Sequence, residues 1–295
     1  MALSHDPLWP RAGDWPALTS LEGPLDAVLV GVPAWRTSLS PTGAHATPAA
    51  VREALRRYSP ALMTGPADLG ALRVADAGDV AEPDGPDGEA AVRALVAEAR
   101  ARTRLVVALG GDNSATYATA QGAGSRGLIT LDAHFDLRDG VSNGSPVRRL
   151  VADGFDGRRI VQLGIADFAN SVAYAERARD YGITVIGLDD VRRRGAADVM
   201  AEALAVAGAG GGDIHLDVDV DVCDRSAAPG CPASIPGGLA AWELRALVRE
   251  AASDARVGSA DIVEVDATAD APDGRTVRLA ALCALELLAG VSLRS

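Results

Sequence analysis

The chain has 295 residues, of which 48% are hydrophobic, enough to build the core of one large domain or two smaller ones. Its 28 lysines and arginines are outnumbered by 40 aspartates and glutamates, and the resulting net charge of -12 opposes the phosphate neutralisation that nucleic-acid binding requires. The N-terminal residues show no basic segment followed by an apolar run. We expect no stretch to be apolar and uncharged over the length needed to cross a bilayer, and we therefore expect a cytoplasmic protein.

Short runs of branched apolar residues recur along the chain and predict buried strands. They span residues 26–33, 104–111, 127–134, 159–165, 183–188, 213–220 and 260–266. Helical patterns lie at residues 47–58, 89–102, 172–181, 240–252 and 276–290. In the first of these, Thr47 is expected to cap the helix, with Pro48 at its first position.

The regular alternation of these strands and helices predicts the fold class. Strands that are apolar throughout are typical of a parallel sheet covered on both faces. We therefore expect an α/β protein in which residues 1–295 form one three-layer α/β/α domain around a mostly parallel sheet. In such folds, functional residues gather beyond the carboxyl ends of the strands.

The first candidate site is the segment Asp-Ala-His-Phe-Asp at residues 132–136. If it continues the preceding strand, the side chains of Asp132, His134 and Asp136 project to one side, because strand residues alternate between two faces. Two carboxylates and an imidazole aimed at one point could bind a metal ion. Helix capping or pairing with surface arginines is the alternative.

The second candidate site places four ionisable residues at alternate positions of one predicted strand. They are His215, Asp217, Asp219 and Asp221. Carboxylates this close repel each other unless cations or hydrogen bonds neutralise them, and the leucine and valines between them supply no charge. Mixed oxygen and nitrogen donors favour manganese or a similar divalent ion over structural zinc. Two such clusters predict two ions, which would activate water without a serine or cysteine nucleophile.

Two further segments carry polar residues next to predicted strands. Residues 110–114, Gly-Gly-Asp-Asn-Ser, could cradle a phosphate or simply cap a helix, but the glycine motifs of nucleotide sites are absent. Glu264 ends the last predicted strand. It could accept hydrogen bonds from a loop, or it could bind two N–H groups of an amidine or guanidine.

In order and spacing, these segments resemble the ureohydrolase family, which includes arginases, agmatinases and formimidoylglutamases. The resemblance rests on GGDNS (110–114), DAHFD (132–136), DVDVCDRSAAPG (219–230), PGGL (236–239) and EVDATAD (264–270). Residues 31–57 also look like the N-terminal segment of the family. The resemblance implies an arginase-like fold, two Mn²⁺ ions at the carboxyl edge of the sheet, and a trimer or hexamer. It implies metal ligands at Asp132, His134, Asp136, Asp219 and Asp221, and it places Asp217 behind them and His215 deeper in the strand.

Two departures from the family pattern reduce the number of candidate activities. Most relatives have a histidine ligand where this chain has Asn113, whose amide is a weaker donor, so we expect one of the two ions to bind loosely. Asn143 stands where arginases carry a proton-shuttling histidine. That difference, and the similarity of residues 162–178, favour the formimidoylglutamase branch. Its members cleave N-formimidoyl-L-glutamate to glutamate and formamide in histidine degradation.

For this substrate, we assign hypothetical roles to residues around the predicted cleft. Asp136 would relay a proton to the departing amine, and Glu264 would hold the amidinium group. Arg138 is the first candidate to bind the substrate carboxylates. The other candidate substrate-binding residues are Arg36, Asn143 and Arg148. Two alternatives remain: an agmatinase or guanidinobutyrase that releases urea, and a metal-poor relative that only binds a small amine.

Overall fold

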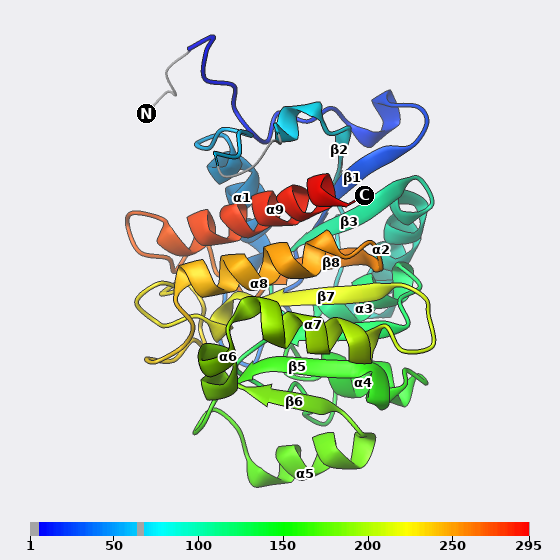
Figure 1. Cartoon of the computed structure of the whole chain (residues 1–295), viewed down its shortest axis with the longest axis vertical. Coiled ribbons are helices and arrows are strands. Elements are labelled where there is room, and N and C mark those ends of the chain that lie inside the picture. Colours follow the sequence, from blue (N-terminus) through cyan, green and yellow to red (C-terminus); the bar gives the residue numbers. More distant parts are fainter. Residues whose placement is uncertain (1–5, 64–67, 295) are drawn as a thin grey trace.

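Eight parallel strands form one sheet in the order β2-β1-β3-β8-β7-β4-β5-β6, which confirms the predicted fold class (Figure 1). The computed structural model describes residues 6–63 and 68–294. The strands are β1 Leu25–Val32, β2 Val74–Asp79, β3 Thr103–Gly110, β4 Gly127–Leu131, β5 Ile160–Ile165, β6 Thr184–Gly187, β7 Ile214–Asp219 and β8 Val257–Val263. The prediction of one domain over residues 1–295 includes residues 1–5, 64–67 and 295, which lie outside the described residues.

Helices cover both faces of this sheet (Figure 1). One layer contains α1 Thr47–Leu55, α6 Leu188–Arg194, α7 Ala196–Ala207, α8 Ala241–Ser253 and α9 Arg275–Leu293. The other layer contains α2 Gly85–Arg100, α3 Ala115–Gly122 and α4 Pro146–Ala152. The remaining helix, α5 Val172–Tyr181, lies next to β6 at the edge of the sheet.

The two faces of the sheet differ in polarity where β7 and β8 run side by side. On the face under α8 and α9, residues such as Leu216 and Ile262 belong to one large apolar cluster, which also holds the free cysteines. On the other face, one apolar cluster lies around β1 and β3 and another around β4 and β5. Between these two clusters, β7 and β8 carry buried polar side chains, namely His215, Asp217, Asp219, Ser259 and Asp261. This polar strip ends at the carboxyl edge of the sheet.

Three local expectations were wrong or incomplete. The edge strand β2 was not predicted, because its sequence Val-Ala-Asp-Ala-Gly-Asp has few branched apolar residues and its last positions are exposed. Nor were α6 and α7 predicted. Thr47 does not cap α1: the helix begins at Thr47 itself, and the threonine hydroxyl donates to the carbonyl of Val265 (2.5 Å).

Helix α9 is long and apolar enough to cross a membrane when judged by length and composition alone. This differs from our expectation that no segment would qualify. In the structure, 72% of that stretch is buried inside the protein, where it packs against α1 and α8. Its apolar composition is therefore accounted for by its place in the core.

Candidate functional site

The segment after β4 brings three candidate ligands together, although not as a strand. Because β4 ends at Leu131, Asp132, His134 and Asp136 lie in the following loop, and the prediction that strand alternation aligns them was wrong. Asp136 has a φ of 53°, a left-handed conformation that is uncommon for a residue other than glycine. Asp132 itself caps the turn, since its Oδ1 accepts a hydrogen bond from the backbone N–H of His134 (2.6 Å).

The end of β7 supplies two more carboxylates. Asp219 is the last residue of the strand, whereas Asp221 lies in the 3-10 turn Val220–Val222. The prediction that Asp221 shares the strand face of Asp219 was therefore wrong. The two side chains are held in place relative to each other because Asp219 Oδ1 accepts a hydrogen bond from the backbone N–H of Asp221 (2.8 Å).

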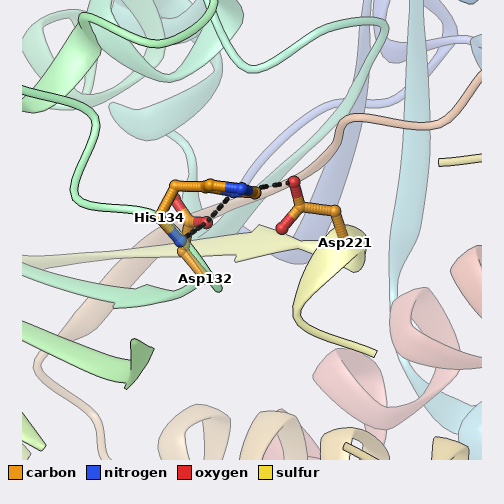
Figure 2. Close-up of side chains that lie close together, drawn as sticks. All are labelled: Asp132, His134 and Asp221. Atoms are coloured by element: carbon orange, nitrogen blue, oxygen red, sulfur yellow. Dashed lines mark hydrogen bonds and ion pairs between the residues drawn. The ribbon is translucent and has the colours of Figure 1, made fainter. Parts of the chain in front are cut away.

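These residues form two overlapping groups of potential metal ligands. Asp132, His134 and Asp221 make up one group, and Asp132, Asp136 and Asp219 make up the other. Within each group, the donor atoms all lie within 4.8 Å of one another. His134 Nδ1 is 3.0 Å from Asp221 Oδ2 and 3.4 Å from Asp132 Oδ1 (Figure 2). Asp132 belongs to both groups and so lies at the centre of the cluster.

Electrostatics make this cluster unfavourable in the absence of cations. Burial, followed by the charge of Asp221, raises the pKa of Asp132 to about 6. Burial and the neighbouring carboxylates raise the pKa values of Asp136 and Asp219 well above the ordinary value. Burial alone would lower the pKa of His134, but Asp221 and Asp132 raise it to about 12. The cluster therefore attracts positive charge strongly.

The residues present fit a pair of divalent metal ions. Among the residues that the structure describes, Asp132 Oδ2 and Asp221 Oδ1 are buried and have no hydrogen-bond partner, and a buried acceptor left unpaired is costly. The donors are four carboxylates and one imidazole, a mixed oxygen and nitrogen set that suits manganese. Each group of ligands could hold one ion, with Asp132 contributing to both.

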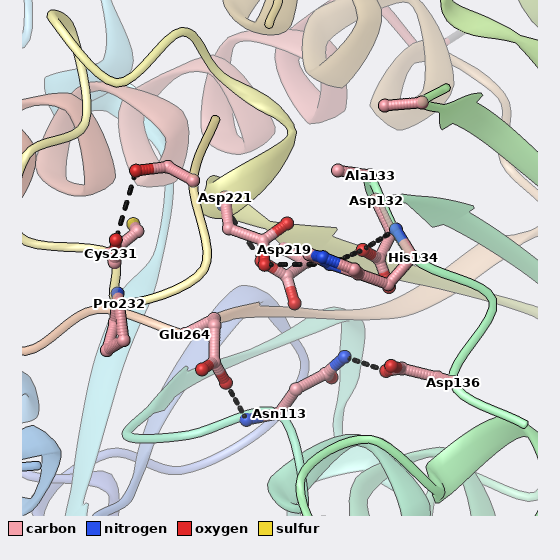
Figure 3. A network of polar contacts seen from close by, with 12 residues as sticks. Asn113, Asp132, Ala133, His134, Asp136, Asp219, Asp221, Cys231, Pro232 and Glu264 are labelled. Atoms are coloured by element: carbon pink, nitrogen blue, oxygen red, sulfur yellow. Dashed lines mark hydrogen bonds and ion pairs between the residues drawn. The ribbon is translucent and has the colours of Figure 1, made fainter. Parts of the chain in front are cut away.

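Glu264 and Asn113 lie on the other side of the site (Figure 3), and Asn143 also contacts Glu264. The backbone N–H of Asn113 donates to Glu264 Oε2 (2.9 Å), and the side-chain amide of Asn143 donates to Glu264 Oε1 (2.9 Å). The side-chain NH₂ of Asn113 donates to Asp136, while its Oδ1 accepts from the hydroxyl of Thr116 (2.6 Å). Asn113 thus links the carboxyl of Glu264 to that of Asp136.

The charge on Glu264 is set mainly by its burial. Burial raises its pKa to about 8, together with the nearby charges of Asp112 and Asp221, although the hydrogen bonds from Asn113 and Asn143 act in the opposite direction. Its backbone is also left-handed, with a φ of 61°. A buried carboxyl held by two neutral donors is suited to receive a cationic group from a ligand.

A cavity of about 410 Å³ opens onto these groups. Eight of the sequence-predicted site residues line it: Asn113, His134, Asp136, Arg138, Asn143, Asp219, Asp221 and Glu264. Asp132 is 1% exposed and lies behind them. From the predicted residues alone, the structure therefore brings carboxylates, an imidazole, two amides and one guanidinium to a single cavity.

Two predicted substrate-binding residues are not brought to this cavity. Arg36 pairs with Glu82 (2.5 Å), and both side chains are exposed. Arg148 donates to the carbonyls of Arg138 and Gly140, both at 2.6 Å. By contrast, Arg138 lines the cavity, and within residues 6–63 and 68–294 its guanidinium has no hydrogen bond or ion pair.

Sequence reasoning singled out no residue of the loop after β5, which forms one wall of the cavity. Phe168, Asn170, Ser171 and Tyr174 all line it. Asn170 donates to the carbonyl of Ala133 (2.8 Å) and accepts from the backbone N–H of Phe135 (3.0 Å), so it fixes the backbone on both sides of His134. The available signal was Asn-Ser immediately before a predicted helix.

Behind the ligands, the polar strip of β7 and β8 forms its own hydrogen bonds. His215 Nδ1 lies 2.8 Å from Ser259 Oγ, and Nε2 lies 3.1 Å from Asp261 Oδ2. Neither carboxyl oxygen of Asp217 has a hydrogen-bond partner in the described part of the chain, and burial together with Asp261 raises the pKa of Asp217 well above the ordinary value. Asp217 and His215 therefore lie deeper than the candidate ligands.

Comparison with known proteins agrees with this architecture. Residues 25–290 match the sequence model of the arginase family. The formimidoylglutamase of Bacillus subtilis strain 168 is 36% identical over 292 residues, which cover 92% of this chain and 88% of that protein. The crystal structure of formimidoylglutamase from Bacillus subtilis subsp. subtilis str. 168 has a TM-score of 0.91 at 32% identity, over 99% of this chain and 95% of that one. The crystal structure of Trypanosoma cruzi formiminoglutamase with Mn²⁺ has a TM-score of 0.84 at 26% identity. The match covers 92% of this chain and 95% of that one.

Adding Mn²⁺ to the metal-free protein should raise its unfolding temperature, and by more at pH 8 than at pH 6. A raised carboxyl pKa means that the folded state keeps protons which the unfolded state has released. The free energy of unfolding of the metal-free protein therefore falls as the pH rises above about 4, the ordinary carboxyl pKa. The fall continues through the pKa of Asp132, about 6, and through the raised pKa values of Asp136 and Asp219. Bound ions replace those protons and remove the penalty.

Calorimetric scans at pH 6 and pH 8, with and without Mn²⁺, measure this effect. The Asp219→Asn variant serves as the control, since it should lose most of the gain from Mn²⁺. Unfolding temperatures that do not respond to Mn²⁺ at either pH would contradict the metal assignment.

Proposed function

Because this chain belongs to the arginase family, we propose that it hydrolyses N-formimidoyl-L-glutamate to L-glutamate and formamide, with two bound Mn²⁺ ions. The observation that carries the proposal is the composition of one cavity. Four of the candidate metal ligands, His134, Asp136, Asp219 and Asp221, line it together with Glu264. Its wall carries Arg138, whose guanidinium has no partner among the described residues. From the family resemblance alone, we also propose that the chain assembles as a trimer or hexamer.

The substrate combines the two kinds of group that this cavity can bind. Its formimidoyl end is an amidine, which is cationic when protonated, and its glutamate end carries two carboxylates. Glu264 can accept N–H groups from the amidine, because its carboxyl faces the cavity and is held there by Asn113 and Asn143. Arg138 can bind a carboxylate through two parallel N–H groups.

Asp132, His134, Asp136, Asp219 and Asp221 would hold the two ions. When bound, the ions supply a water of lowered pKa as the nucleophile. Glu264 keeps the amidine carbon oriented for attack. Asp136 takes the proton released in the addition and returns it to the glutamate nitrogen, so that the C–N bond breaks and the amine leaves. Formamide and glutamate are then the two products, and one water is consumed.

Arg138 is presented by a loop that other arginines hold in place. Arg148 from α4 donates to the carbonyls of Arg138 and Gly140. Arg177 from α5 donates to the carbonyl of Leu137 (2.6 Å) and pairs with Asp139. These contacts fix the backbone around Arg138 and leave its guanidinium available. We therefore assign Arg148 to support of Arg138 in place of direct substrate contact.

With Mn²⁺ supplied, the chain should release formamide from N-formimidoyl-L-glutamate much faster than it releases urea from arginine or agmatine. The reason is that only the first substrate offers an amidine to Glu264 and two carboxylates at the other end. Parallel assays of formamide, urea and glutamate over this substrate panel measure the preference. Urea from a guanidino compound as the dominant product would identify a different amidinohydrolase. Absence of turnover with two ions bound would favour a binding protein.

Replacing Arg138 by alanine should raise KM for N-formimidoyl-L-glutamate by about tenfold to a hundredfold, because a charge-assisted hydrogen bond contributes roughly 1.5–3 kcal/mol. Arg138→Lys should recover part of the loss, since lysine keeps the charge but not the paired N–H geometry. The matched control is Arg158→Ala, which removes an exposed arginine that pairs with Asp156 and does not line the cavity. An unchanged KM in Arg138→Ala would remove Arg138 from the substrate site.

The weaker of the two ions should bind more tightly in an Asn113→His variant. Imidazole is a better donor than an amide, and the Asn113 side chain already contacts Asp136, a candidate ligand. Titration calorimetry with Mn²⁺ and metal analysis after dialysis measure affinity and stoichiometry. Asn113→Ala is the control, because it removes the contact with Asp136 without adding a ligand. Equal affinity in the histidine variant and the original protein would place Asn113 outside the metal site.

A further inference from the structure

Phe168 occupies an unusual position in the loop that follows β5. Its side chain is fully exposed, yet the residue lines the cavity described above. Among the described residues, Leu39 and Phe168 are the two large exposed apolar side chains that line this cavity. Burial of the aromatic ring therefore contributes nothing to the folded state of the protein alone.

The backbone at Phe168 is also strained. Its φ of 64° lies in the left-handed region, which a residue with a Cβ atom adopts only at an energetic cost. An aromatic residue has no short polar side chain that could bond locally to offset this cost. Strain of this kind persists where the surrounding structure fixes the backbone, and it is concentrated at functional sites.

The surrounding structure does fix this loop. On the side before Phe168, the backbone N–H of Ala166 donates to the carbonyl of Ala133 (3.1 Å). On the side after it, the side chain of Asn170 bonds to the backbone of Ala133 and Phe135. Both anchors lie on the segment that carries His134. The loop is thus tied to the candidate metal site, and Phe168 is held in its strained conformation at the cavity mouth.

An apolar mouth above a polar floor matches the shape of the proposed substrate. Carboxylates and amides at the floor can bind the amidine, and Arg138 can bind the carboxylates, but the aliphatic carbons between these ends need an apolar contact. Phe168 is the exposed aromatic residue that can supply it. A ring placed over this part of the ligand would also exclude water, which strengthens the interaction of Arg138 with the carboxylates.

We propose that Phe168 is a specificity-determining residue, whose ring covers the aliphatic part of the bound substrate and closes the cavity mouth. The assignment rests on the proposed function, because it takes the cavity as the place where an amidine with an aliphatic chain binds. The contact is made equally in the ground state and the transition state. Loss of the ring should therefore raise KM and leave kcat almost unchanged.

Phe168→Gly separates the two properties of this residue, since it removes the ring and relieves the backbone strain. We expect KM for N-formimidoyl-L-glutamate to rise about tenfold, kcat to stay within about threefold, and the unfolding temperature to rise by roughly 1–4 °C. Phe168→Asn also tolerates the left-handed conformation and should show the same rise in KM. Phe168→Tyr keeps the ring and should have the KM of the original protein.

Specificity provides a second readout. N-formimidoylglycine has the amidine but lacks the aliphatic side chain, so its kcat/KM should change little in Phe168→Gly. The preference for the glutamate compound over the glycine compound should therefore fall about tenfold. Val172→Ala is the matched control, because Val172 is exposed and begins the helix that follows this loop but does not line the cavity. It should leave KM and the preference unchanged.

Each outcome decides the assignment. If the original protein turns over N-formimidoyl-L-glutamate but the glycine and asparagine variants keep its KM and preference, Phe168 has no role in specificity, although the proposed function stands. A lower unfolding temperature in Phe168→Gly would overturn the strain argument. If the original protein turns over no amidine at all, the proposed function fails, and the role of Phe168 fails with it.

Discussion

Repulsion among buried carboxylates is the constraint on which the rest of this structure depends. Four aspartates from two separate segments, with Asp132 at their centre, meet at the carboxyl edge of the sheet, where water cannot screen their charges. Protons can relieve this repulsion in the metal-free protein, as the raised carboxyl pKa values show, and divalent ions can relieve it more completely. The arrangement is unfavourable as a structural device. It is useful as a metal site, because the ligands are already assembled before an ion arrives.

The fold accommodates this charge by making the two faces of the sheet unequal. Under α8 and α9, apolar side chains of β7 and β8 join the largest hydrophobic cluster of the molecule. On the opposite face, the same strands carry the polar strip that contains His215 and Asp261 in place of apolar side chains. Two smaller hydrophobic clusters flank that strip. Support for the ligands therefore extends two residue layers below the cavity. Because the strip buries polar side chains, it contributes less stabilisation by apolar burial, and the apolar layer on the other face has to supply that stabilisation.

The sequence was sufficient to predict the layers, the parallel sheet and the segments that meet at its edge, because these follow from apolar periodicity and from strand-helix alternation. It was insufficient where loop conformation decides. Asp221 lies in a 3-10 turn, and the backbone of Asp136 is itself left-handed. Strand periodicity can show neither conformation. Arg36 and Arg148 could not be distinguished from Arg138, since their partners Glu82 and the carbonyl of Gly140 become neighbours only in the folded chain. Phe168 lies within residues 162–178, whose family resemblance was visible, but nothing in the sequence distinguished it from its neighbours.

The measurement that tests this account most directly is crystallographic: anomalous diffraction at the manganese absorption edge from crystals grown with Mn²⁺. The account predicts two separate anomalous peaks, one among the side chains of Asp132, His134 and Asp221 and the other among those of Asp132, Asp136 and Asp219, with Asp132 contacting both ions. Crystals that show no anomalous peak here, with the aspartates paired to each other through shared protons or turned toward other donors, would contradict it.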